Sequence, residues 1–143
     1  MVRSHTLDQV GRGPSVPQSH RCESETVEMS VMRGHYRYVM MTADPILTRL
    51  RHDLDATFGP RIERIVLYGS RARGDAEPDS DYDVAVFLRD FAGHWQESRP
   101  LVKIETRLID ETGALVHAIP LPAGAWTNRT PLMGAIRRDG IDL

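Results

Sequence analysis

The sequence has little cysteine and no long apolar run, and each of these absences excludes a class of structure. Cys22 is the only cysteine among 143 residues, which excludes an internal disulfide and a cage of thiolate metal ligands. No apolar stretch approaches the roughly 20 residues that cross a bilayer, and the first residues lack the apolar centre of a secretory signal. We therefore predict a cytoplasmic protein that has no membrane partner.

Lysine is also nearly absent, because Lys103 is the only lysine among 18 basic residues. Arginine forks suit phosphate and carboxylate recognition, although genome composition produces the same bias. The formal net charge of -2 gives no general attraction to nucleic acid. The length allows one domain of ordinary size.

The chain divides near residue 40. Residues 1–40 carry Gly11, Gly13, Pro14 and Pro17, frequent serines and mixed charges, and their few aliphatic residues follow no sustained period. We expect a disordered N-terminal extension there, and Met40 and Met41 raise the hypothesis that translation starts at this point. Residues 41–143 are predicted to form the folded domain.

From residue 41 onward, helical and strand-like segments alternate. Asp44 is a candidate N-cap with Pro45 at the first helical position, and Gly59-Pro60 ends that helix. The patterns predict helices over 45–58, 98–112 and 130–140, and strands over 62–68, 81–88 and 115–121. Trp95 and Trp126 are expected to pack on the sheet or to cover its edge. Together these segments predict helices layered on a small sheet.

Two carboxylates stand at the start of the strand over 81–88. Strand side chains alternate, so Asp81 and Asp83 share a face about 6.6 Å apart along the backbone, while Tyr82, Val84, Val86 and Leu88 suit a core. At an effective dielectric constant of ~20 the two charges repel by roughly 2.5 kcal/mol. A divalent cation reverses the sign of that energy, and Mg²⁺ fits best because it takes oxygen ligands and completes its shell with substrate phosphates.

The corner "GSRARG" before this strand supplies a complementary phosphate site. Gly69 allows close approach of the backbone, Ser70 adds a hydroxyl donor, and Arg71 and Arg73 are candidates to neutralise phosphate charge. The corner is not a P-loop, because Asp75 and Ala76 stand where that loop needs lysine and then serine or threonine. Phosphates beside metal-binding carboxylates predict a triphosphate site.

These residues resemble a known family. Tyr68-Gly69-Ser70 followed by Asp81-Tyr82-Asp83-Val84 is similar to the signature of the DNA polymerase beta-type nucleotidyltransferase superfamily. The forms "GSRARG" and "DSDYD" look most like its minimal single-domain members, which often pair with small helical HEPN proteins in toxin–antitoxin systems. The resemblance covers roughly residues 43–143. It implies an α+β fold with helices packed on a small mixed β-sheet.

The resemblance also implies roles for individual residues. Gly69 and Ser70 would contact the nucleotide phosphates, and Asp81 and Asp83 would be catalytic and bind two Mg²⁺ ions. ATP or another nucleoside triphosphate would donate a nucleoside monophosphate, AMP above all, to a hydroxyl. The acceptor implied is a tyrosine of a HEPN toxin, which makes this chain the antitoxin.

One feature departs from the family pattern. Superfamily members commonly carry a third carboxylate on the strand after the long helix, but that strand reads "LVHAIPL" here. His117 is its nearest polar residue; a neutral imidazole accepts a proton, but it is a poor Mg²⁺ ligand. Asp110 and Glu111 end the preceding helix and are further candidates.

Two other functions stay open on the sequence. A domain without the third acid could neutralise its partner by direct contact, as a catalytically weak or inactive nucleotide-binding module. An enzyme that modifies an antibiotic hydroxyl needs an additional wall around the acceptor, for which this chain is short. The alternative to any function is purely structural: Ser70 would be a helix N-cap, and Asp81 and Asp83 would be solvated surface charges.

Overall fold

The computed structural model describes residues 43–143, in which a four-stranded sheet separates two layers of helices. The predicted extension over 1–40, the alternative start and Cys22 lie outside the described residues. The elements follow in this order: α2 (Pro45–Phe58), η1 (Gly59–Arg61), β1 (Ile62–Tyr68), α3 (Gly69–Arg73), β2 (Tyr82–Leu88), α4 (His94–Thr112), β3 (Val116–Pro122), η2 (Ala125–Thr127), α5 (Pro131–Asp139) and β4 (Ile141–Asp142).

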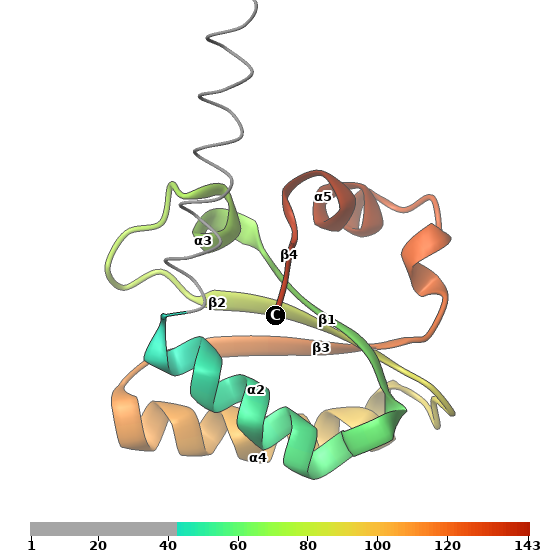
Figure 1. The fold of residues 1–143 in the computed structure, drawn as a ribbon, viewed down its shortest axis with the longest axis horizontal. Coiled ribbons are helices and arrows are strands. Elements are labelled where there is room, and N and C mark those ends of the chain that lie inside the picture. The colour runs from blue at the N-terminus through green and yellow to red at the C-terminus, as the bar shows by residue number, and fades with distance from the viewer. Residues whose placement is uncertain (1–42) are drawn as a thin grey trace, which may run out of the picture.

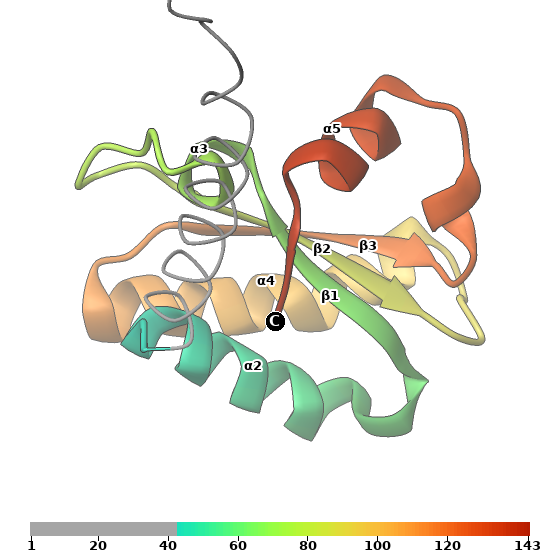
Figure 2. The same cartoon turned by 45° about the horizontal axis from the view of Figure 1, so that its top comes forward.

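The sheet is mixed, which confirms the predicted α+β class. Its strand order is β3-β2-β1-β4; β1 runs antiparallel to β2 and β4, and β2 runs parallel to β3. Helices α2 and α4 cover one face, and α3 and α5 lie over the other (Figure 1). Both layers remain distinct when the molecule is turned (Figure 2). The two faces of β2 therefore have different surroundings.

The alternation of β2 accounts for its two faces. Tyr82, Val84, Val86 and Leu88 are buried in the core under α2 and α4, as predicted. Residues of the opposite parity, Ala85 and Phe87, pack in a second core with Met133 and Ile136 of α5. The first residue of that second parity in β2 is Asp83, which lies beyond the apolar part of this face.

Helix α2 begins and ends where the sequence predicts. The Asp44 carboxylate accepts hydrogen bonds from the N–H groups of Ile46 and Leu47, and Gly59 is the C-cap. Thr130 caps α5 in the same way by accepting from the Met133 N–H at 3.2 Å. The predicted helix boundaries at these positions are confirmed.

Helix α4 is one turn longer than predicted. It begins at His94 rather than Ser98, and Pro100 lies inside it. The added turn is held by Glu97, which is 3% exposed, pairs with Arg61 and accepts from the Ala92 N–H at 3.0 Å. The Arg61 hydrogen bond, with help from the Ala92 N–H, holds the pKa of Glu97 below its usual range despite burial. The start of α4 thus depends on the pairing of Glu97 with the distant Arg61, which the local sequence pattern does not reveal.

Two further expectations were wrong or incomplete. Trp95 is 76% exposed and packs on no sheet, whereas Trp126 lies edge-on against Phe87 at a centroid distance of 5.9 Å, as expected. Strand β4 was not predicted, because two residues are too short to show a period. It pairs with β1 and is tied to it by the Arg64–Asp142 ion pair.

The β3 edge of the sheet is closed to further strands. The Ala118 N–H, which points away from β2, donates to Glu105 of α4 at 2.6 Å. By alternation, Pro120 and Pro122 stand at the next outward positions and have no N–H to offer. In the part of the chain that the structure describes, no helix is sufficiently long and apolar to span a bilayer.

Candidate active site

Asp83 lies on the open part of the sheet face that α3 and α5 share. It is the second residue of β2 and its side chain is 34% exposed. Many aspartates of the domain form ion pairs with arginine, including Asp53, Asp55, Asp75 and Asp142. Within residues 43–143 no arginine or lysine pairs with Asp83. Its charge is therefore available to a cation.

Gly69 and Asp83 are in close contact. Gly69 follows β1 with φ +76°, a left-handed backbone that glycine adopts without strain. A Cβ at this position would lie 2.4 Å from the Asp83 Oδ2 atom. The Asp83 carboxylate thus occupies the space that a side chain at position 69 would fill, and only glycine permits this approach. The sequence predicted that Gly69 and Asp83 belong to one site, and the structure places them side by side.

Ser70 is the second residue of α3, and Gly74 ends that turn in a left-handed conformation. The backbone N–H groups of Gly74 and Asp75 bond to the Ser70 carbonyl. The corner therefore contains a short helical turn. It starts at the C-terminal end of β1, beside Asp83.

His117 stands opposite Asp83 on the neighbouring strand. The two residues are register partners in the parallel β2–β3 pair, and His117 Nδ1 lies 3.8 Å from Asp83 Oδ1. The imidazole is 65% exposed on the same sheet face. His117 is thus adjacent to the carboxylate, as a residue replacing a third acid needs to be.

Asp81 is exposed and lies immediately before β2. Like Asp83, it pairs with no arginine or lysine among the described residues. In that same region, no group of three or more histidine, cysteine, aspartate or glutamate side chains converges closely enough to enclose a metal on its own. A metal bound here would therefore need oxygen ligands from water or substrate, which is the usual situation for Mg²⁺.

Tyr82 and Arg71 fix the loop that carries Asp81. The Tyr82 hydroxyl donates to the second Asp44 oxygen at 2.9 Å, so the N-cap of α2 is linked to β2. Burial, with the Asp44 hydrogen bond and charge, raises the pKa of Tyr82 to about 12. The Arg71 guanidinium stacks on the Tyr82 ring at 3.9 Å and donates to the carbonyls of Ser80 and Pro78.

Arg71 and Arg73 therefore occupy different surroundings, although the sequence grouped them. Arg71 holds the loop over 75–80 through two backbone carbonyls and the Tyr82 ring. Arg73 is exposed, and its one ion-pair partner within residues 43–143 is Asp75, at 3.1 Å. The structure gives Arg71 a positioning role that no sequence pattern signalled. Contact of either guanidinium with phosphate stays a prediction.

Replacing Arg71 with glutamine is expected to loosen the loop over 75–80 and the backbone of Asp81. The variant loses the stacking on Tyr82 and the charge-assisted bonds to Ser80 and Pro78, so amide hydrogen exchange should speed up in this segment by about tenfold or more. Arg73→Gln is the matched control, because its exposed ion pair contributes little. Equal exchange in both variants would show that Arg71 does not hold the loop.

Tyr68 closes the side of the site opposite His117. It is the register partner of Asp83 on β1 and packs against the core under α5. Burial and then the negative charge of Asp83 raise its pKa. Its place at the end of this strand was predicted, whereas its register with Asp83 was not.

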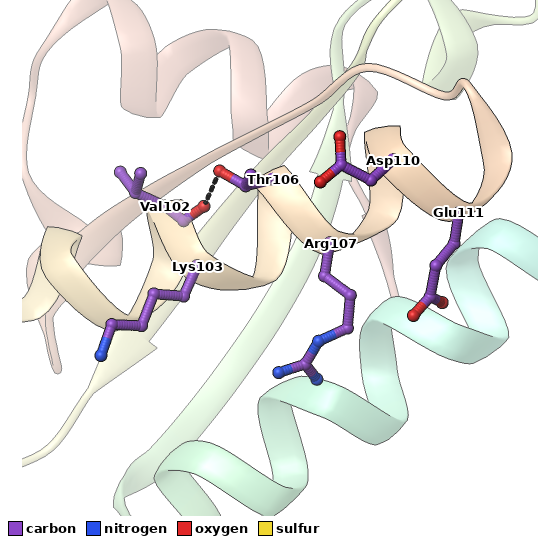
Figure 3. Close-up of a pocket in the computed structure, with 6 residues that line it drawn as sticks. All are labelled: Val102, Lys103, Thr106, Arg107, Asp110 and Glu111. Atoms are coloured by element: carbon purple, nitrogen blue, oxygen red, sulfur yellow. Dashed lines mark hydrogen bonds between the residues drawn. The ribbon is translucent and has the colours of Figure 1, made fainter.

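The exposed face of α4 has a hollow of about 440 Å³ that does not belong to this site. Its lining residues all come from α4: Val102, Lys103, Thr106, Arg107, Asp110 and Glu111 (Figure 3). Helix α4 covers the sheet face opposite the one that carries Asp83. Glu111 pairs there with Arg49 of α2 at 3.2 Å. Asp110 and Glu111 are thus excluded as the third acid.

Comparison with known proteins identifies the class of this fold and site. Residues 47–123 match the family model described as a nucleotidyltransferase domain, and the chain therefore belongs to that family. The resemblance predicted from Gly69-Ser70 and Asp81-Tyr82-Asp83 is confirmed at this level.

The individual relatives are more distant. Over 62 residues, which are 43% of this chain, the sequence is 29% identical to a Methanocaldococcus jannaschii protein whose assigned name is that of a protein adenylyltransferase. The chain spans 62% of the length of that relative. A crystal structure described as a toxin-antitoxin with AMP-PNP is 19% identical, with a TM-score of 0.50 over 66% of this chain and 69% of that chain. A toxin-antitoxin MntA-HpeT structure is 20% identical, with a TM-score of 0.47 over 68% of both chains. The TM-score of 0.50 shows a shared fold.

Proposed function

We propose that this protein is a Mg²⁺-dependent nucleotidyltransferase that moves AMP from ATP to a hydroxyl acceptor. The observation that carries this proposal is the contact of Gly69 with the Asp83 carboxylate, which has no arginine or lysine partner within residues 43–143. A phosphate-binding corner and a free carboxylate in one space are what a metal-bound triphosphate requires. The family membership supports the reaction class.

The residues divide the chemistry between them. Gly69 and Ser70 would bind phosphate oxygens through the backbone and the hydroxyl, and Asp81 and Asp83 would hold Mg²⁺, with two ions expected. When bound, Mg²⁺ would supply charge stabilisation at the α-phosphate of ATP. The acceptor oxygen forms a bond to the α-phosphorus, the bond from that phosphorus to the bridging oxygen breaks, and pyrophosphate leaves with the electron pair. His117, beside Asp83, is the candidate that accepts the hydroxyl proton.

The acceptor we favour is a tyrosine on a HEPN-type partner, which this chain would neutralise as an antitoxin. The name of the M. jannaschii relative supports transfer of AMP to protein. Residues 41–143 would carry the activity, in the cytoplasm. ATP is the expected donor, with other nucleoside triphosphates as alternatives.

The direct test is to incubate the protein with Mg-ATP and the product of the neighbouring gene, and then to weigh both proteins by intact mass spectrometry. We expect a mass increase of one or more AMP groups on the partner, on tyrosine after peptide mapping. A partner that stays unmodified while ATP is bound would contradict the proposed acceptor.

A second function, partner neutralisation by contact alone, is favoured by one observation: β3, from Val116 to Pro122, carries no carboxylate. The double variant Asp81→Asn with Asp83→Asn separates the two functions. An enzyme loses neutralisation of its partner in this variant, whereas a contact-only antitoxin retains it. Cell growth during co-expression of the partner reports the outcome.

A further inference from the structure

His117 and Asp83 form a pair that is placed for a shared metal ion. They are register partners on β3 and β2, and both side chains lie on the open sheet face. The 3.8 Å between Nδ1 and Oδ1 is too long for a hydrogen bond. Two ligands of one ion, each at about 2.0–2.2 Å, can lie up to about 4.3 Å apart. The separation therefore fits one ion between the two atoms.

A second imidazole–carboxylate pair shows why the first is different. His52 Nδ1 lies 3.3 Å from Asp53 Oδ1, but Asp53 is 6% exposed and also pairs with Arg49 and Arg107. The Asp53 charge is thus already compensated. Asp83 has neither an arginine partner within residues 43–143 nor that degree of burial. Of these two pairs, only Asp83–His117 has room and uncompensated charge for a cation.

The donor set also decides which cation binds well. Mg²⁺ strongly prefers oxygen ligands, whereas imidazole nitrogen raises affinity for first-row transition ions in the Irving–Williams order. A carboxylate at position 117 would keep the site suitable for Mg²⁺. An imidazole there changes the selectivity of the same position.

We propose that Asp83 and His117 bind a divalent first-row transition ion in place of the second Mg²⁺ of the nucleotidyltransferase site. This rests on the proposed function, because phosphate and water would complete the shell of the ion. The first Mg²⁺, on the nucleotide, keeps oxygen ligands alone. His117 is then a metal ligand that sets the identity of the ion. It takes this role instead of accepting the hydroxyl proton, because a neutral imidazole bound through Nδ1 carries its proton on Nε2.

The test uses Mn²⁺ as the probe on the full chain, with ATP and excess Mg²⁺ present. Pulsed electron paramagnetic resonance reports whether a nitrogen is bound to the Mn²⁺, independently of turnover. We expect nitrogen coupling in the wild-type protein and its loss in His117→Asn, with Mn²⁺ affinity lowered about tenfold or more. His52→Gln is the matched control and should leave both the coupling and the affinity unchanged.

A second variant, His117→Asp, tests the expected change in metal selectivity. It supplies an oxygen donor, so Mg²⁺ should compete with Mn²⁺ about tenfold better than it does in the wild-type protein. Absence of nitrogen coupling in the wild type, or coupling that survives in His117→Asn, would overturn the inference. Calorimetry with Mg-ATP separates a failure of this inference from a failure of the proposed function. If the wild-type protein binds Mg-ATP but shows no nitrogen coupling, the inference is wrong and the proposed function still stands.

Discussion

Replacing Asp83 with asparagine is expected to abolish nucleotidyl transfer and to weaken Mg-ATP binding strongly. The side chain keeps its shape but loses the charge that would hold the metal. Asp83 is the carboxylate that contacts Gly69 and lies 3.8 Å from His117, so no other described acid stands in the same place. We expect the rate to fall by at least about a hundredfold, the scale for one preorganised electrostatic group. Single-turnover transfer from labelled ATP measures the effect.

The matched control is Asp79→Asn, in the exposed loop two residues before Asp81. It removes the same charge from the same end of the sheet and should leave the rate within about twofold. Thermal unfolding of both variants should resemble that of the wild-type protein, because Asp83 forms no ion pair with arginine within residues 43–143. Full activity in Asp83→Asn would show that this carboxylate does not bind the catalytic metal.

Replacing Gly69 with alanine is expected to remove activity by a different route. The left-handed backbone at φ +76° costs an alanine about 1–2 kcal/mol, and the new Cβ would lie 2.4 Å from Asp83 Oδ2. The carboxylate has to move away from the corner to relieve that contact. Mg-ATP binding should therefore be lost along with part of the stability, as calorimetry and urea unfolding would show.

Gly74→Ala is the control for backbone strain. Gly74 has φ +85°, yet an added Cβ would meet nothing within 4 Å. Both variants should lose the stability that backbone strain costs, and Gly69→Ala should lose more because of its contact with Asp83. Only Gly69→Ala should lose nucleotide binding. If both variants bind Mg-ATP like the wild-type protein, the contact between the corner and Asp83 has no role in the site.

The parts of the fold that could be predicted from sequence are those with local causes. Asp44 with Pro45, Gly59 with Pro60, and Thr130 with Pro131 are local signals for helix ends, and the structure confirms all three. The start of α4 and the short strand β4 were missed, because Arg61–Glu97 and Arg64–Asp142 join residues 36 and 78 positions apart. Local periodicity carries no information on such pairs.

The candidate site shows the same division. The spacing of Gly69-Ser70 and Asp81-Tyr82-Asp83 predicted that two segments act together, and the contact of Gly69 with Asp83 brings the two segments together. The partners of Arg71 were missed, since carbonyl groups and an aromatic ring face leave no pattern in the sequence. His117 was singled out only for its place on β3, and strand register then put it beside Asp83.

Together these contacts assign separate tasks to neighbouring residues. Tyr82 and Arg71 would hold the loop, Gly69 gives the carboxylate its space, and Asp83 with His117 would face the metal and the substrate. Variants of the first group should alter loop exchange before they alter chemistry. Variants of the last group should alter chemistry while the fold remains intact.

Isothermal titration calorimetry of the folded full chain with ATP, in the presence and absence of Mg²⁺, tests most directly whether this corner of the sheet receives a metal-bound triphosphate. We expect saturable heat with Mg-ATP, little with ATP alone, and its loss in Asp83→Asn. A folded wild-type protein that gives no heat with any Mg-bound ribonucleoside triphosphate would contradict the proposed function.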